Sequence, residues 1–575
     1  MFYYFVLPSS NLSQFQPLCG KLTNLGSPEE QEQFQAKLTK YKTMVKTVAI
    51  IGAGISGLGA IKACLEEGLE PTCFEKSDDL GGLWRFTDKV EDGRASIYRS
   101  LVTNVSKEMM CLSDFPMPDD FPNFLPNSKY LEYIKLYAEN FKLLKYIKFK
   151  TAVCRVEKTS DFSITGQWFV TTETDGDKTT DLFDAVMVCT GQHAQPVSST
   201  NTIPGIEKFK GQVLHCREYK KPVGFDGKRI LIVGMGNTGV DISTELCTRA
   251  SQVYLSSRKG VWVLRRLGKG GLPFDLIFIR RYKTWIQNIL PPAVSRWMIK
   301  KYMNDQFDHG LYNIEPQGIK WKEPLVNEEF PSRVLSGSII VKDGVTAFTE
   351  TSAHFEDSSV VDNLDVVILA TGYKYSFPFL DDSVVKIDET KGSLYKKIIP
   401  LGIEKPTIGF ISFILPIGPV MVIAELQSRW TARLFKGLHK LPSSEEMKEE
   451  MKMDEKQREK WFATAENNFR RTDYISYLDD LSSAIGVKPD LFKMFLTDPL
   501  LAFKVVFGPF NPYQLRLTGP GKWSGAREAI LTQWDRIEKP LRTRVMKRDY
   551  KSPLASLMLW FYGFLLVLAA IWLKN

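Results

Sequence analysis

The most regular pattern along the chain joins a buried strand, a glycine turn and a helix. The β-branched run Lys46–Ile51 predicts a short parallel strand that is buried on both faces. It leads into GAGISG at residues 52–57, then into a helical pattern as far as Glu67 and a second strand that ends at Glu75. Such glycines let the backbone approach a pyrophosphate, and a carboxylate after the second strand holds ribose hydroxyls. The unit predicts a dinucleotide site.

The same pattern recurs later in the chain. The run Lys228–Val233 leads into GMGNTG at residues 234–239, then into a helix and a strand followed by Arg258. Arg258 stands where the first unit has Glu75. Arginine suits a 2′-phosphate, whereas a carboxylate suits a free ribose hydroxyl. We therefore expect FAD at the first unit and NADPH at the second. The alternative for Arg258 is an ordinary surface charge.

Two further segments resemble each other and predict how the domains are nested. FDAVMVCTG at 183–191 and LDVVILATG at 364–372 follow the two glycine turns at similar separations, so each predicts the strand that closes its own domain. We expect an α/β fold with two nested Rossmann-like domains. The predicted boundaries are 44–195 for the first part of the FAD domain, 196–345 for the NADPH domain and 346–552 for the second part of the FAD domain.

Composition narrows the functional class. Of the 575 residues, 44% are hydrophobic and 25% are charged, which is typical of a globular protein and excludes a disordered chain. The net charge of +9 is too small for its length to favour nucleic acid as a partner. The eight cysteines include no CxxC pair, which favours free thiols and argues against a disulfide reductase. The five histidines form no cluster, so no bound metal is expected.

The two ends of the chain differ from its body. Residues 554–573 (LASLMLWFYGFLLVLAAIWL) contain no charge and match the length of a helix that crosses a bilayer. Basic residues precede them, and by the positive-inside rule these keep the body in the cytosol. We therefore predict a transmembrane tail anchor at 553–575, with a buried core helix as the alternative. Residues 1–43 are assigned no role.

A further motif identifies the family that the chain resembles. Phe209, Gly211, His215 and Tyr219 form the pattern FxGxxxH followed by a tyrosine, and FEKSDDLGGLWRF, SLVTNVSKEMM and GPFNPYQLRLTGPGKW stand elsewhere in the chain. With these motifs the chain resembles the vertebrate microsomal flavin-containing monooxygenases, of the dimethylaniline monooxygenase type, from residue 44 to its end. One departure is Cys216, where the family usually has serine.

The resemblance implies an activity and a location. NADPH reduces FAD, O₂ adds to give a C4a-hydroperoxyflavin, and a small nitrogen or sulfur nucleophile takes the distal oxygen. It also implies the endoplasmic reticulum membrane, with the catalytic body facing the cytosol, and leaves self-association open. Three alternatives remain: a Baeyer–Villiger monooxygenase acting on ketones, a largely uncoupled NADPH oxidase that releases H₂O₂, and a catalytically silent NADPH-binding protein.

The glycine units and the resemblance together assign site residues. The first turn and its neighbours are expected to bind FAD through Gly52, Ala53, Gly54, Ile55, Ser56, Gly57, Glu75, Leu83 and Trp84. The second is expected to bind NADPH through Gly234, Gly236, Thr238, Gly239, Val240, Asp241 and Arg258. The alternative for Trp84 is core packing, and for Asp241 it is capping or pairing within the helix.

The catalytic residue that the resemblance implies is Asn104, which lies with Thr103 and Val105 at the junction of flavin and nicotinamide. A neutral amide both donates and accepts hydrogen bonds without supplying a proton that would expel H₂O₂. A turn-forming asparagine and a glycosylation sequon are its alternatives. His215 is expected to link domains rather than to catalyse.

Two segments outside the glycine units also carry predictions. The insert at 267–331 mixes large apolar with basic residues and is expected to cover the substrate pocket or to lie in a membrane interface. A buried pair of core helices is its alternative. The charged run at 443–471 predicts a solvated helix.

Overall fold

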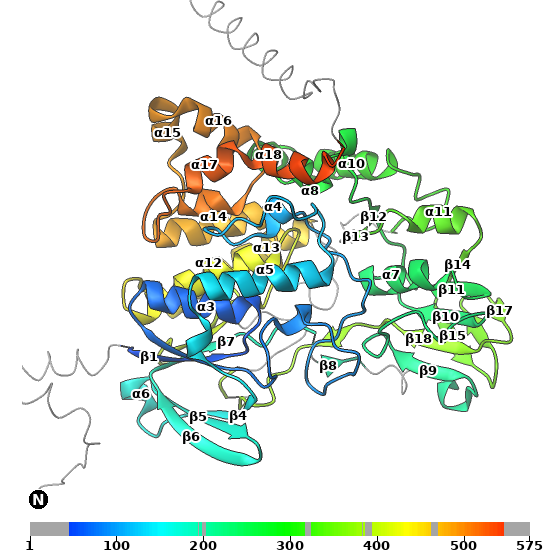
Figure 1. Cartoon of the computed structure of the whole chain (residues 1–575), viewed down its shortest axis with the longest axis horizontal. Helices are drawn as coiled ribbons and strands as arrows, with labels where there is room; N and C mark the ends of the chain where they lie inside the picture. Colours follow the sequence, from blue (N-terminus) through cyan, green and yellow to red (C-terminus); the bar gives the residue numbers. More distant parts are fainter. Residues whose placement is uncertain are drawn as a thin grey trace, which may run out of the picture.

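The structure, a computed structural model, describes residues 45–193, 195–197, 203–316, 324–381, 383–385, 394–461 and 470–544. Two five-stranded parallel sheets organise these residues (Figure 1). The strands of the first sheet, in spatial order, are β22 (Ile408–Phe410), β7 (Ala185–Val188), β1 (Thr47–Ile51), β2 (Glu70–Phe74) and β3 (Ile147–Lys148). Those of the second are β14 (Ile339–Lys342), β11 (Gln252–Ser256), β10 (Arg229–Val233), β18 (Val366–Leu369) and β9 (Gln212–His215).

The two repeated segments close their sheets as the sequence predicts. β7 pairs with β1 in parallel, and β18 pairs with β10 in parallel. The chain then returns to the first sheet, because β22 pairs with β7. These pairings confirm the α/β class and its two Rossmann-like sheets. The residue boundaries of the nested domains stay a prediction.

Successive side chains of β1 point to opposite faces of the first sheet, which explains the layers on either side of it. Val48 and Ile50 belong to the core beneath helices α3 (Ile55–Glu66), α5 (Asn127–Asn140), α12 (Val420–Phe435) and α14 (Tyr474–Ile485). Ala49 and Ile51 face the other way, against the antiparallel sheet of β4 (Thr151–Lys158), β5 (Trp168–Thr174) and β6 (Asp177–Phe183). A strand covered on both faces reads as a continuous apolar run, which is what the sequence has here.

The second sheet is covered in the same manner. Helices α7 (Asn237–Leu246) and α11 (Phe330–Leu335) lie on one face (Figure 1), and β15 (Val345–Phe348), β16 (Ala353–Phe355) and β17 (Val360–Val361) pack on the other. The shorter pairs are β8 (Gln195–Pro196) with β19 (Tyr373–Lys374), β12 (Val263–Leu264) with β13 (Leu325–Val326), β20 (Leu394–Tyr395) with β21 (Ile399–Pro400), and β23 (Leu415–Pro416) with β24 (Arg471–Thr472).

The longest remaining helix that the structure describes is α13 (Ser444–Trp461), which matches most of the solvated charged helix expected at 443–471. Residues 462–469 lie outside the described part, and Arg471 belongs to β24. The insert forms α8 (Phe274–Phe278), α9 (Arg281–Ile289) and α10 (Pro292–Asn304). The others are α4 (Lys107–Met110), α6 (Phe162–Thr165), α15 (Leu491–Thr497), α16 (Pro499–Phe507), α17 (Ala526–Leu531) and α18 (Gln533–Glu538).

The predicted membrane anchor cannot be compared with the fold. Residues 553–575 lie outside the described part of the chain, and so do residues 1–43. Within the described part, no helix has both the length and the apolar character that a bilayer crossing demands.

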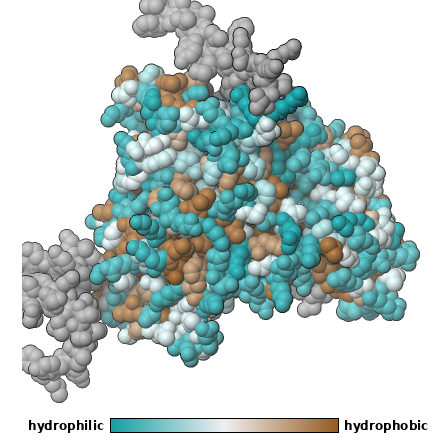
Figure 2. Space-filling view, in the orientation of Figure 1, coloured by the Kyte–Doolittle hydropathy of each residue, from teal (hydrophilic) through white to brown (hydrophobic). Residues whose placement is uncertain are grey.

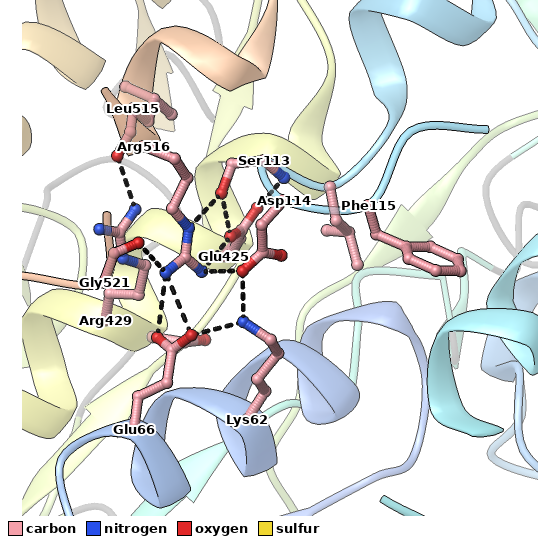
Figure 3. A network of polar contacts seen from close by, with 12 residues as sticks. Lys62, Glu66, Ser113, Asp114, Phe115, Glu425, Arg429, Leu515, Arg516 and Gly521 are labelled. Atoms are coloured by element: carbon pink, nitrogen blue, oxygen red, sulfur yellow. Dashed lines mark hydrogen bonds and ion pairs between the residues drawn. The ribbon is translucent and has the colours of Figure 1, made fainter. Parts of the chain in front are cut away.

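Buried charges tie the helix of the first glycine unit to distant segments (Figure 3). Arg516, whose side chain is 1% exposed, pairs with Glu66 of α3, Asp114 and Glu425 of α12 at 3.1, 3.2 and 2.9 Å. Lys62 of α3 bonds Asp114 at 2.6 Å. Arg429 of α12 donates to two backbone carbonyls. Lys62, Arg429 and Arg516 together balance the three acidic side chains of Glu66, Asp114 and Glu425. We call these six residues the charge network.

Electrostatics within the charge network depend on this balance. Burial raises the pKa of Asp114. Burial also acts to raise the pKa of Glu425, but the guanidiniums of Arg516 and Arg429 outweigh it, so this pKa lies below its ordinary value. Arg516 is therefore the cation on which several buried carboxylates rely.

Replacing Arg516 by alanine should destabilise the protein by about 3–5 kcal/mol, because it leaves buried carboxylates without their partner. A thermal melt that follows the release of FAD fluorescence would detect the change. The matched control is Arg527→Ala, which removes an exposed ion pair with Asp498 and should change the melt little. Equal melting temperatures of the two variants would contradict a stabilising role for the charge network.

Candidate functional site

The first glycine turn has no room for side chains. Gly52 has φ +101°, and a Cβ there would lie 2.9 Å from the carbonyl oxygen of Cys189. A Cβ on Gly57 would lie 1.9 Å from the carbonyl oxygen of Gly52, so the helix packs directly on the turn. Gly54 is the N-cap of α3 and has no side chain to cap it. The first amides of the helix therefore suit a pyrophosphate.

Glu75 lies against this turn, where the sequence places it. Its carboxylate accepts the N–H of Ala53 at 2.8 Å and the N–H of Ser77 at 2.9 Å, and the side chain is buried. Ser56, in the first turn of α3, shares a 2.6 Å hydrogen bond with Ser412, which the sequence did not single out. Ile55 begins α3 and is half-buried.

Leu83 and Trp84 are adjacent to the same turn. The N–H of Gly81 donates to the carbonyl of Ala53 at 3.1 Å, which brings segment 81–84 onto the glycines. Leu83 and Trp84 are half-buried, and the ring of Trp84 meets Tyr130 edge-on at 4.5 Å. Core packing of Trp84 is thus observed, and its expected place beside FAD stays a prediction.

The second glycine turn has the same geometry and more open space. Gly234 has φ +115°, and a Cβ on Gly239 would lie 2.0 Å from the carbonyl oxygen of Gly234. A Cβ on Gly236, the N-cap of α7, would meet nothing within 4 Å. The uncapped helix start therefore opens onto space that a phosphate can enter. Thr238 is half-buried beside it, and Val240 is buried in the core of this domain.

Arg258 and Asp241 differ in how they are engaged. Arg258 follows β11, is exposed, and makes no hydrogen bond or ion pair with any residue that the structure describes. Asp241 accepts from the hydroxyl of Tyr98 at 2.6 Å and from the amide of Asn327 at 2.9 Å, and burial raises its pKa. Arg258 is thus available to a ligand, whereas the Asp241 carboxylate links α7 to neighbouring segments.

Asn104 lies beside the second glycine turn, although it belongs to the first unit. Its amide nitrogen donates to Asn237 at 3.2 Å, and Asn237 is the first residue of α7. Its amide oxygen accepts from Arg266 at 2.8 Å. Arg266 also donates to the carbonyl of Thr103 at 3.1 Å and pairs with Glu328 at 2.9 Å. The amide therefore spans the junction of the two units instead of only forming a turn.

The neighbours of Asn104 are held by their own bonds. The hydroxyl of Thr103 donates to the carbonyl of Val105 at 3.0 Å and accepts the N–H of Leu125 at 2.9 Å. Thr103 is buried, and these bonds fix the segment. Its place beside the cofactors stays a prediction.

The sequence reasoning missed Asn237 and Arg266. Asn237 stands inside GMGNTG, and a polar residue at a helix start was a signal that could have been used. Arg266 gives no such signal, because only the folded chain brings it to Asn104.

The motif around His215 has a structural explanation. A Cβ on Gly211 would lie 2.5 Å from the carbonyl oxygen of Asp365 and 2.6 Å from the ring of Phe209, so glycine is required. His215 ends β9 and stacks edge-on against Tyr373 at 5.5 Å. Burial lowers the pKa of His215. A half-buried ring at the end of β9, packed against Tyr373 of β19, fits a linking role.

Comparison with known proteins gives consistent results. The sequence model of a family described as "FMO-like: Flavin-binding monooxygenase-like" matches residues 45–575. The chain is 52% identical to dimethylaniline monooxygenase [N-oxide-forming] 2 of Cavia porcellus over 88% of this chain and 94% of that protein. It is 51% identical to flavin-containing monooxygenase 2 of Homo sapiens over 92% of this chain and 98% of that protein.

Solved structures share the fold. S-allyl-L-cysteine S-oxygenase from Allium sativum matches with a TM-score of 0.59 at 23% identity, over 86% of this chain and all of that one. An open crystal structure of cyclohexanone monooxygenase matches with a TM-score of 0.57 at 15% identity, over 76% of this chain and 97% of that one.

Arg258→Ala tests the assignment of the second turn to NADPH. Loss of a charge-assisted phosphate contact should raise the KM for NADPH about 10–100-fold, equivalent to about 1.4–2.7 kcal/mol, and leave the KM for NADH nearly unchanged. The matched control is Arg249→Ala, an exposed arginine of the same domain that pairs with Asp226. Equal losses with both cofactors would contradict the assignment to the 2′-phosphate.

Proposed function

Because the chain belongs to the flavin-binding monooxygenase-like family, we propose that it oxygenates small molecules that carry a soft nitrogen or sulfur nucleophile. The protein is an oxidoreductase that uses FAD, NADPH and O₂. A sequence relative is named as an N-oxide-forming enzyme, and a solved structure that shares the fold is named as an S-oxygenase; N- and S-oxygenation are the two reaction types we propose here.

The observation that carries the proposal is the contact between Asn104 and Asn237, 3.2 Å across the junction of the two glycine units. When bound, FAD supplies the redox chemistry with NADPH and O₂. The residues of the chain bind and orient: the starts of α3 and α7 bind phosphates, Glu75 binds a ribose, and Asn104 holds the reacting groups at the junction. Its neutral amide adds no acidic proton there.

Two rival functions remain to be separated by experiment. Ketone oxygenation has support only from the fold shared with cyclohexanone monooxygenase, at 15% identity. An NADPH oxidase would keep the same nucleotide sites and release only H₂O₂.

The purified FAD-loaded protein should be given NADPH, O₂ and, in turn, dimethylaniline, a dialkyl thioether and cyclohexanone. We expect an N-oxide and a sulfoxide as the main products. Faster formation of a lactone from the ketone would favour the Baeyer–Villiger alternative. An H₂O₂ yield that equals NADPH consumption with every substrate would overturn the proposal in favour of an oxidase.

Asn104→Ser tests the catalytic assignment. FAD should stay bound, because the glycine turn and Glu75 are unchanged. Product per NADPH should fall and H₂O₂ per NADPH should rise, with an oxygenation rate lower by a factor on the order of a hundred, as for other positioned hydrogen-bonding groups. Asn104→Asp places a carboxylate where negative charge develops, so it should be at least as harmful. Unchanged yields in the serine variant would show that Asn104 is only a turn residue.

We also propose attachment to the endoplasmic reticulum membrane through residues 553–575, with the body in the cytosol. The surface of the described body supports a nearby membrane. Figure 2 shows brown patches at its upper edge, where Figure 1 places α15, α16 and α10. Exposed there are Trp297 of α10 (62%) and Phe492 and Leu496 of α15 (77% and 73%). Ile289 of α9 is 82% exposed, so α9 and α10 are not the buried pair that was the alternative for the insert.

Deletion of residues 553–575 should release the protein from microsomal membranes with FAD still bound, because both glycine turns precede the anchor. Sedimentation after a carbonate wash measures the release, and the full chain is the control. Retention of the truncated chain through that wash would show that another surface is a membrane element. Release that needs high salt would indicate an interfacial contact of the exposed helices.

A further inference from the structure

Asp275, the second residue of α8, bonds the backbone of the segment that carries Asn104. Its side chain is fully buried, and one carboxylate oxygen accepts the N–H of Ser106 at 2.6 Å. The other accepts the N–H of Leu276 at 2.9 Å. Ser106 is the N-cap of α4 and stands two residues after Asn104. A residue of the insert thus fixes the backbone next to the catalytic amide.

This bond lies in an apolar environment. Met109 of α4, Leu276 of α8 and Ile537 of α18 form a buried cluster, and Val105 packs against it. Burial raises the pKa of Asp275 to about 6, and the N–H of Ser106 opposes that rise. Because a pKa of about 6 is still below 7, the carboxylate is ionised at neutral pH. Its hydrogen bond is charge-assisted and shielded from water.

Arg266, which directly precedes the insert, holds the segment at its other end. Arg266 donates to the amide oxygen of Asn104 at 2.8 Å and to the carbonyl of Thr103 at 3.1 Å. Arg266 and Asp275 lie only nine positions apart in the sequence. Arg266 bonds residues 103 and 104, and Asp275 bonds residue 106. With both ends fixed, the Asn104 amide has little freedom to turn away from Asn237.

We propose that Asp275 is a positioning residue for the oxygenating step, which it supports by fixing the backbone beside Asn104. The proposal rests on the role of Asn104 in the proposed function. A purely structural Asp275 would change stability alone, whereas a positioning residue changes the partition of NADPH between product and H₂O₂.

The decisive variants act on the two partners of one hydrogen bond. Ser106→Pro removes the N–H donor and places a ring carbon toward the Asp275 carboxylate, and the φ of Ser106, −73°, suits proline. Ser106→Ala, its matched control, keeps the N–H and removes only the hydroxyl. Asp275→Ala removes the acceptor, whereas Asp275→Asn keeps the shape and one neutral acceptor.

With a thioether as substrate, the ratio of sulfoxide to H₂O₂ should fall about tenfold in Ser106→Pro and Asp275→Ala, as expected for the loss of a bond to a charged group. Ser106→Ala should stay within about twofold of the native ratio, and Asp275→Asn should recover part of the loss. The KM for NADPH should not change. The double variant Ser106→Pro/Asp275→Ala should be no worse than the poorer single variant, because both remove the same bond.

Two results would overturn the proposal. One is a lower melting temperature in Ser106→Pro and Asp275→Ala with a native ratio of sulfoxide to H₂O₂. The other is an equal loss in Ser106→Ala and Ser106→Pro. The Asn104→Ser variant shows whether such a result overturns only the role of Asp275 or also the role of Asn104 in the proposed function. If Asn104→Ser keeps the native ratio, the role of Asn104 itself fails. If Asn104→Ser lowers the ratio and the other variants do not, only the role of Asp275 fails.

Discussion

The contact between segment 98–106 and the start of α7 is the constraint on which the site depends. It consists of the bonds from Tyr98 to Asp241 and from Asn104 to Asn237, at 2.6 and 3.2 Å. Each glycine turn could bind its nucleotide without this contact. Together with the bonds from Arg266 to Thr103 and Asn104, the contact brings the two turns to one junction, where a group held by one can react with a group held by the other. Catalysis by positioning needs this kind of fixed geometry.

Two kinds of packing make the junction rigid. The glycine turns are so tight that added Cβ atoms would meet backbone oxygens at 1.9 and 2.0 Å, so α3 and α7 start at fixed places on their sheets. The charge network then joins α3 to α12 and to Arg516, which lies far along the chain (Figure 3). Because buried ion pairs tolerate little displacement, this arrangement favours one orientation of α3.

Local rules made a large part of the fold predictable. The glycine turns, the strands before them and Glu75 follow from sterics and strand periodicity within about thirty residues. The returning strands β7 and β18 could be predicted because they repeat one another. Arg266, Asp275 and Arg516 could not, because their partners are distant in sequence and adjacent only in the folded chain. Asp241 shows the limit of a motif, since its carboxylate bonds Tyr98 and Asn327 in addition to its predicted place beside NADPH.

A single-turnover experiment tests most directly whether the junction, and not FAD alone, directs oxygen to the substrate. The FAD-loaded protein is reduced with dithionite in the absence of air and then mixed with O₂ and a thioether, with or without NADP⁺. The account predicts mostly sulfoxide when NADP⁺ occupies the second turn and mostly H₂O₂ when it does not. Equal sulfoxide yields with and without NADP⁺ would contradict it.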